Sequence, residues 1–192
     1  MNRTDPLDLV TTGVAVGGAG IARDGDGRVV FVEGALVGER VRVEIVQTKK
    51  SFRRGRVLDV LEPAPGRVLP SCPGIANGCG GCDLAHASHA AQREMKAAMV
   101  ADSLRRLGRL DDLPDIDPGP DLATTGFRTT IRAAVVDGRA GLRHRRSHDV
   151  VAVASCEVAH PLVEGLLVNG RYGNADEVTI RVGANTGEQA VF

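Results

Sequence analysis

Hydrophobic and polar residues alternate in several short runs in the first third of the chain. The clearest run covers 40–46, where Val41, Val43 and Ile45 share one face of an extended segment and charged residues occupy the other. The segment Asp24–Gly27 is a strong turn signal before another apolar run. The strands expected here are 8–11, a strand beginning at Ile21, 28–32, 40–46 and 55–61. Strands this short, separated by glycine-rich turns, are typical of a small closed barrel of the oligonucleotide-binding (OB) type.

Helical periodicity first occurs after a proline-rich break at 63–70, which predicts a domain boundary. A helix is expected over 89–107, with Ser88 as its N-cap and Gly108 ending it. The expected buried stripe of this helix is Ala97, Val100, Ala101, Leu104 and Leu107.

The last third of the chain again predicts strands. Asp137–Gly138 between two apolar runs suits a type I′ hairpin turn joining 131–136 to 139–143. Further strands are expected at 150–154 and 178–182, with Pro161 opening a short helix through Leu167. The chain ends at 189–192 inside an expected strand, so we expect it to be a truncated form of a longer protein.

These elements predict a mainly β fold with some α. Residues 1–64 are expected to form the small OB-like β-barrel. Residues 65–192 are expected to form a partial α+β central domain that contains a cysteine-rich loop at 72–82.

Composition narrows the class of protein without identifying a partner. Hydrophobic residues make up 43% of the chain and charged residues 25%, which suits a soluble globular protein. Aromatic residues make up only 3%, so an aliphatic core is expected. No signal peptide or membrane-length apolar run is visible, so a cytoplasmic monomer without membrane contact is expected. Lys plus Arg and Asp plus Glu both number 24, so only the distribution of charge is informative.

The four cysteines, Cys72, Cys79, Cys82 and Cys156, carry the strongest chemical signal. Three thiolates on a glycine-rich loop, joined by one distant thiolate, can hold a four-iron, four-sulfur cluster. A structural zinc site, two disulfides and buried free thiols are the alternatives. The long first gap between cysteines fits a zinc ribbon less well than an iron–sulfur site.

Basic residues gather in two places and predict RNA binding. The first group surrounds one aromatic residue near the end of the expected barrel: Lys49, Lys50, Phe52, Arg53, Arg54 and Arg56. The second follows the expected hairpin: Arg139, Arg143, His144, Arg145, Arg146 and His148. Phe127 and Arg128 could add an aromatic ring and a guanidinium against a base. A solvated hairpin tip is the alternative interpretation of the first group.

Several segments together resemble the RNA uracil-C5 methyltransferases, whose best known members act on ribosomal RNA. Gly17–Arg23 and Val30–Val43 resemble a TRAM domain. The cysteine loop, Ala91–Lys96, Gly126–Arg128, Gly141–Val151 and Cys156 then follow in the order of that family. The resemblance covers nearly the whole chain and corresponds to the N-terminal half of the family.

The resemblance implies a TRAM barrel that grips RNA, a four-iron cluster held by all four cysteines, and a central domain that presents RNA. In the family, a C-terminal domain binds S-adenosylmethionine, and a cysteine thiolate there adds to C6 of uracil so that C5 takes the methyl group. No cysteine is left over here for that role, so the chain alone is expected to be inactive.

Two details depart from the family pattern. The first cysteine gap has six residues where many relatives have five, and Thr129–Thr130 stand where basic or amide residues are common. A stand-alone RNA-binding TRAM protein and a zinc-stapled interaction protein remain the alternatives.

Overall fold

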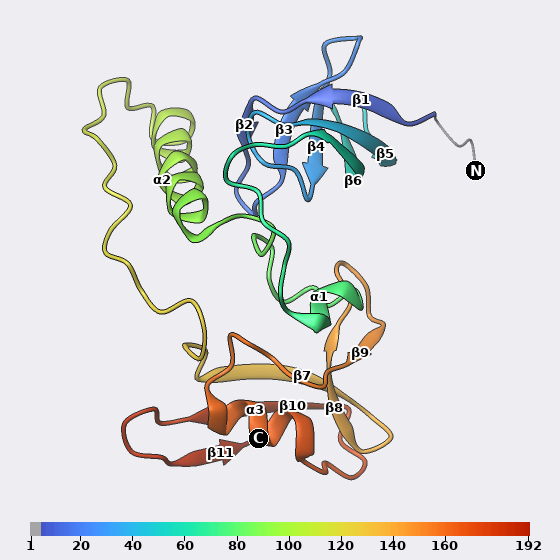
Figure 1. Ribbon diagram of the computed structural model, residues 1–192, viewed down its shortest axis with the longest axis vertical. Coiled ribbons are helices and arrows are strands. Elements are labelled where there is room, and N and C mark those ends of the chain that lie inside the picture. The colour runs from blue at the N-terminus through green and yellow to red at the C-terminus, as the bar shows by residue number, and fades with distance from the viewer. Residues whose placement is uncertain (1–4) are drawn as a thin grey trace. The chain divides into compact units, whose positions relative to one another are not determined.

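The computed structural model describes residues 5–192, and its first sheet has six strands in the order β1-β5-β6-β4-β3-β2 (Figure 1). The strands are β1 Leu7–Val10, β2 Gly13–Val14, β3 Gly20–Arg23, β4 Val29–Glu33, β5 Arg40–Thr48 and β6 Phe52–Glu62. All neighbours are antiparallel except β4 and β6, which are parallel. The expected short strands are thus confirmed, whereas closure of the sheet into a barrel stays a prediction.

The core of this sheet is aliphatic, as the composition predicts. Val30 and Val32 of β4, together with Val41 and Val43 of β5, have no exposed surface. Ile45 packs against the same cluster. The alternation along 40–46 therefore sorts side chains between core and solvent as expected.

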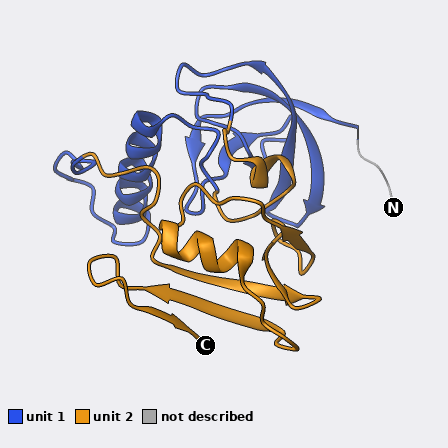
Figure 2. Cartoon of the chain, turned by 60° about the horizontal axis from the view of Figure 1, so that its bottom comes forward, with its two compact units in different colours: residues 1–69, 83–120 blue, residues 70–82, 121–192 orange. Residues whose placement is uncertain are grey.

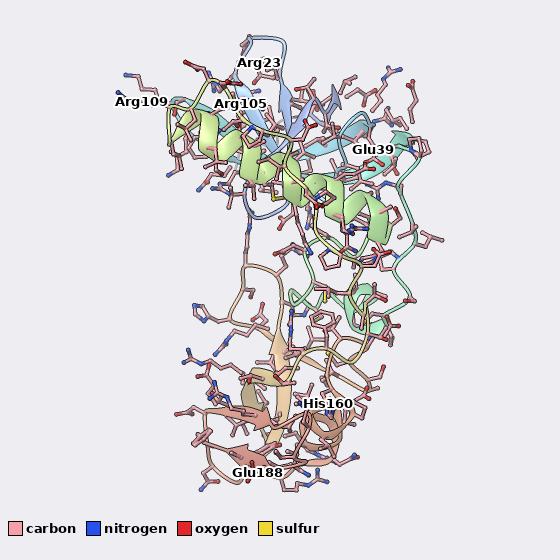
Figure 3. The ribbon with its side chains drawn as sticks, turned by 90° about the vertical axis from the view of Figure 1, so that its left-hand side faces the viewer. Arg23, Glu39, Arg105, Arg109, His160 and Glu188 are labelled. Carbon is pink, nitrogen blue, oxygen red and sulfur yellow. The ribbon has the colours of Figure 1, made fainter. Side chains whose placement is uncertain are left out.

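A buried ion pair fastens the loop before β5 to the segment after β6. Glu39, labelled in Figure 3, has no exposed surface, and its carboxylate accepts hydrogen bonds from Arg67 Nε and Nη2. The backbone N–H groups of Leu36 and Ala64 donate to the same carboxylate over 2.8 and 3.2 Å. Four donors thus satisfy a charge that burial alone would strongly disfavour.

Helix α2, His89–Arg106, begins where the sequence predicts. The Ser88 hydroxyl accepts a hydrogen bond from the N–H of Ala91, which makes Ser88 the N-cap. The predicted buried stripe is wrong, because Val100 is 48% exposed and Leu107 is 81% exposed.

The buried face of α2 instead contains Ala91, Met95 and Met99, at positions i, i+4 and i+8. These residues pack with Val14 and Leu36 in a small cluster beside the first sheet. Apolar residues occur on more than one side of this helix, so periodicity alone did not determine which side faces its neighbour.

The second sheet has five strands in the order β11-β10-β7-β8-β9, all antiparallel. The strands are β7 Thr130–Val136, β8 Arg139–Arg143, β9 Val150–Ala152, β10 Glu177–Val182 and β11 Gln189–Val191. Asp137 and Gly138 join β7 to β8 with φ values of 50° and 71°. Two positive φ values in a two-residue loop confirm the predicted type I′ turn.

Helix α3, Pro161–Asn169, covers one face of the second sheet. Val163 and Leu167 of the helix are buried against Ile131, Val178 and Ile180 of the sheet. His160, labelled in Figure 3, precedes the helix and accepts a hydrogen bond from the N–H of Leu162. The predicted short helix opened by Pro161 is confirmed.

Contacts divide the chain into two compact units, each made of two stretches of sequence (Figure 2). Unit 1 consists of 1–69 and 83–120, and unit 2 of 70–82 and 121–192. The cysteine loop therefore belongs to unit 2. The sequence-based domains 1–64 and 65–192 stay a prediction. Within residues 5–192, no helix has the length and apolar character that a membrane crossing requires.

Candidate metal centre and RNA interface

The cysteine loop of unit 2 is fastened to the turn between β8 and β9. The N–H of Gly80 donates to the carbonyl of Arg143 over 3.0 Å, and the N–H of Arg145 donates to the carbonyl of Gly78 over 3.3 Å. Cys79 forms an isolated antiparallel bridge with His144. Figure 1 shows the loop and its short helix α1, Pro73–Ala76, beside β9. Backbone hydrogen bonds thus fix the position of Cys79.

Helix α1, which sequence reasoning missed, shapes the first part of the loop. Cys72 is its N-cap residue and Pro73 its first residue. The N–H of Cys79 returns to the carbonyl of Gly74 over 2.8 Å. A Cβ added to buried Gly74 would lie 3.5 Å from Cys72 Sγ and 3.5 Å from Cys79 Cβ. Cys72 and Cys79 therefore both lie next to Gly74, at ordinary van der Waals distance from a Cβ placed there.

Cys156 reaches the same neighbourhood from the segment between β9 and α3. It is buried, and its N–H donates to Glu164 Oε1 over 2.7 Å. The hydroxyl of Ser71 donates to Glu157 Oε2 over 2.9 Å. That bond joins the residue before Cys72 to the residue after Cys156.

The thiols influence one another electrostatically. Burial raises the pKa of the Cys82 thiol above its ordinary value, Arg128 opposes the rise, and Cys156, Cys79 and Cys72 increase it. Burial likewise raises the pKa of Cys156, with a further increase from Cys72. Thiols whose ionised forms repel one another need a cation to be held together as thiolates.

The chemistry of this donor set fits a soft metal centre, and its spacing does not form a ready cage for one ion. All four cysteines are free thiols. Within residues 5–192, no three His, Cys, Asp or Glu side chains lie close enough together to hold a single metal ion. The ligand set Cys72, Cys79, Cys82 and Cys156 therefore stays a prediction.

Gly80→Ala tests how tightly the loop is held. A Cβ on Gly80 would lie 2.8 Å from Arg145 Cα and 2.9 Å from Arg145 N, so the loop must move away from the β8–β9 turn. We expect the free energy of unfolding to fall by about 1–3 kcal/mol in urea titrations.

Gly165→Ala is the matched control for that variant. Gly165 lies on the exposed side of α3 with nothing within 4 Å of an added Cβ, so alanine should stabilise the helix by about 0.5–1 kcal/mol. Equal unfolding curves for Gly80→Ala and wild type would contradict the close fit.

The first basic group divides along the strand that carries it. Lys49 and Lys50 are exposed in the β5–β6 turn. Arg53 stands opposite Val30, on the core side of β6, and pairs with Asp24 over 3.0 Å. Arg56 pairs with Glu44 over 2.6 Å. The basic side chains of this group therefore differ in whether a carboxylate already neutralises their charge, and their predicted contacts with RNA stay a prediction.

Phe52 and Arg54 lie on the opposite side of β6 from Arg53. The guanidinium carbon of Arg54 is 5.5 Å from the centre of the Phe52 ring and 5.8 Å from that of Phe31. Sequence reasoning missed Phe31. Phe31 lies opposite Arg54 because β4 pairs with β6, and this parallel pairing is not visible in the sequence.

The second basic group is also divided. Arg143 donates to the carbonyl of His148 over 2.8 Å and lies 3.9 Å from Glu177. Arg145 donates to the carbonyl of Cys82 over 3.1 Å, so it belongs to the cysteine loop. Arg146 is exposed in the turn before β9.

Phe127 and Arg128 differ in their surroundings, and their predicted contact with a base stays a prediction. The Phe127 side chain is 53% exposed, whereas Arg128 lies near the thiols and lowers the pKa of both Cys82 and Cys156. Arg128 is thus placed to offset negative charge at the cysteine loop.

Residues 11–58, which include most of the first sheet, match the family model of the TRAM domain. An uncharacterized RNA methyltransferase of Corynebacterium efficiens is 41% identical over 172 residues, covering 88% of this chain and 41% of that protein. The chain carries a TRAM domain and is homologous to RNA methyltransferases. A 23S rRNA (uracil(1939)-C(5))-methyltransferase of Halomonas elongata is 40% identical over 83% of this chain and 34% of that protein.

A solved structure agrees with this assignment at the level of the fold. The tRNA (uracil-54, C5)-methyltransferase of Pyrococcus abyssi superposes with a TM-score of 0.62 at 20% identity, covering 95% of this chain and 44% of that one. The chain spans about two fifths of the length of the RNA methyltransferases it matches, 41% for the Corynebacterium protein.

Proposed function

We propose that this chain is the RNA-binding and cluster-binding N-terminal portion of an S-adenosylmethionine-dependent RNA (uracil-C5) methyltransferase that acts on ribosomal RNA in the cytoplasm. The observation that carries the proposal is the similarity to an RNA methyltransferase over 88% of the chain, together with the TRAM match at residues 11–58. Within the whole protein, this portion selects and orients RNA, and the remaining length supplies methyl transfer.

Four thiols would hold the cluster: Cys72, Cys79 and Cys82 from the loop and Cys156 from the segment before α3. A bound four-iron cluster would supply a covalent tie between these two segments, so its proposed role is structural. The Arg128 guanidinium would offset part of the negative charge of the thiolates.

Phosphate contacts are assigned chiefly to Lys49 and Lys50 in the TRAM domain, because both ammonium groups are exposed. Arg53 and Arg56 contribute less, because each already has a carboxylate partner. In unit 2, Arg146 is assigned to the RNA backbone and Phe127 to a base. Arg143 contributes less to the backbone contacts, because it lies 3.9 Å from Glu177.

The double variant Lys49→Ala, Lys50→Ala tests this assignment. Each phosphate contact contributes about 0.7 to the slope of log K against log salt for single-stranded RNA, so losing two should reduce the slope by about 1.4. Fluorescence anisotropy with a labelled single-stranded RNA at several salt concentrations measures the change.

Lys96→Ala is the control for this experiment, since Lys96 is exposed on α2, outside every proposed contact. An unchanged slope and affinity in the double variant would remove the β5–β6 turn from the RNA interface.

A further inference from the structure

The solvent side of the TRAM sheet carries an aromatic cluster that the core does not need. Along β4, Val30 and Val32 are fully buried, while Phe31 between them points to the other side. The register places Phe31 directly opposite Arg54 of β6 and opposite Ile21 of β3. An aromatic ring therefore lies in the middle of the solvent-facing side of three adjacent strands.

Phe31, Phe52 and Arg54 form a compact triangle, which we call the platform. The two ring centres are 5.6 Å apart with an angle of 72° between the ring planes. The Arg54 guanidinium carbon is 5.8 Å from one ring centre and 5.5 Å from the other. Edge-to-face rings and a cation within about 6 Å of both stabilise this arrangement before any ligand binds.

The chain uses its few aromatic residues in an uneven way. It has four Phe, one Tyr and no Trp, and the core beneath this sheet is built from Leu, Ala, Val and Ile. Two of the four Phe nevertheless meet on the solvent side of one sheet. Both rings are only half-buried, and aromatic surface left accessible beside a guanidinium is typical of a binding face rather than of packing.

The charges around the platform favour a single-stranded nucleic acid, a polyanion whose unpaired bases present flat rings. Arg54 lies over the rings, and the N–H of Lys49 donates to the carbonyl of Phe52 over 2.9 Å, which fixes the lysine turn to the same strand end. Lysines can hold phosphates while rings and guanidinium stack on bases. Duplex RNA offers its backbone but no free base face, since its bases are already stacked.

We infer that Phe31, Arg54 and Phe52 are the stacking site for an unpaired base of single-stranded RNA. The inference rests on the proposed RNA-binding function and adds to it the class of RNA and the residue Phe31. Stacking supplies affinity for single strands, and the lysine turn supplies the dependence on salt.

The test uses the full 192-residue chain and a 12-nucleotide RNA containing one 2-aminopurine, a base whose fluorescence is quenched when it stacks. The chain has no Trp and one Tyr, so its own emission interferes little. Phe31→Leu, Phe52→Leu keeps apolar volume and removes both rings. We expect binding to weaken at least about fivefold, with loss of quenching and an unchanged salt slope.

Phe192→Leu is the matched control, because Phe192 is 75% exposed in unit 2 and belongs to no proposed contact. Arg54→Lys keeps the charge and loses the planar guanidinium, so it should also weaken quenching, while Arg40→Lys should not. The Arg54 variant decides the question if the double Phe variant melts early in thermal unfolding.

The possible results distinguish failure of the stacking site from failure of the proposed RNA-binding function. Wild-type quenching and affinity in both platform variants would overturn the stacking site and leave the RNA-binding proposal intact. A wild-type chain that binds neither single-stranded nor duplex RNA would overturn both. Equal affinity of the wild type for a duplex of the same length, without quenching, would restrict the interface to phosphates and overturn the stacking site.

Discussion

Cys156→Ser is expected to remove nearly all iron from protein purified without oxygen. The broad absorbance of an iron–sulfur cluster at about 400 nm should be lost with it. The serine hydroxyl is a hard, weakly acidic ligand in place of a thiolate. Cys156 lies buried before α3, and its loss leaves three thiols that all come from one loop. Iron and sulfide analysis per chain, with the absorbance spectrum, measures the effect.

Ser155→Ala is the matched control, because it alters the neighbouring side chain and leaves all four thiols. It should keep the iron content of the wild type. Full iron content in Cys156→Ser would show that this residue is not a ligand. Zinc without iron in the wild type would instead favour the zinc-stapled alternative, and neither metal would leave four reduced thiols.

Glu39→Gln is expected to cause the largest loss of stability of any conservative change in unit 1, about 3–5 kcal/mol in the free energy of unfolding. The substitution leaves the positive charge of Arg67 without its partner. It also turns an amide NH₂ toward a group that already donates, either the N–H of Leu36 or that of Ala64, because these two bind different carboxylate oxygens. Urea unfolding at neutral pH measures the loss. Glu62→Gln is the control, because its pair with Arg40 is exposed and worth about 0–1 kcal/mol.

Glu39→Gln should also change how the free energy of unfolding depends on pH in acid. Burial alone would raise the pKa of Glu39, but hydrogen bonds from Arg67 and from two backbone N–H groups hold it below its ordinary value. A lowered pKa in the folded state adds stability above the ordinary value of 4.5, and that stability is lost as the pH falls through the folded pKa. The difference in free energy of unfolding between wild type and Glu39→Gln should therefore become smaller in acid. A difference that does not change with pH would contradict the lowered pKa of Glu39.

Local chemistry explains which elements were predictable from the sequence. The Asp137–Gly138 turn, the Ser88 cap and the alternation along β5 each depend on residues close together in the chain, and all three are confirmed. The buried side of α2 depends on what the helix packs against, so Met95 was missed in favour of Val100. The parallel pairing of β4 with β6 is likewise set by the rest of the sheet.

The candidate RNA interface shows how one missed boundary changes an interpretation. The sequence predicts a strand only from residue 55 and leaves Arg53 and Arg54 in the preceding loop, but β6 already begins at Phe52. From there the period of two along a strand sends Arg54 to the solvent side and Arg53 toward Asp24. The pairing of Arg53 could not be foreseen, because Asp24 reaches it through tertiary structure.

The four cysteines were expected to form one site, but the contacts that bring Cys156 toward the loop are not visible in the sequence. The hydrogen bond from Ser71 to Glu157 spans 86 positions along the chain. No local pattern predicts that contact. The cysteine pattern and the family resemblance both predict that Cys156 joins the loop, and the four-cysteine ligand set stays a prediction.

The chain passes between its two units after residues 69, 82 and 120. Neither unit is encoded by one continuous stretch of sequence. Exchanging residues 1–69 alone with a related protein would therefore leave the rest of unit 1, residues 83–120 with α2, unchanged. During translation Cys72–Cys82 leave the ribosome well before Cys156, which belongs to the same unit. The proposed four-thiol site would therefore be complete only once most of unit 2 has been synthesised.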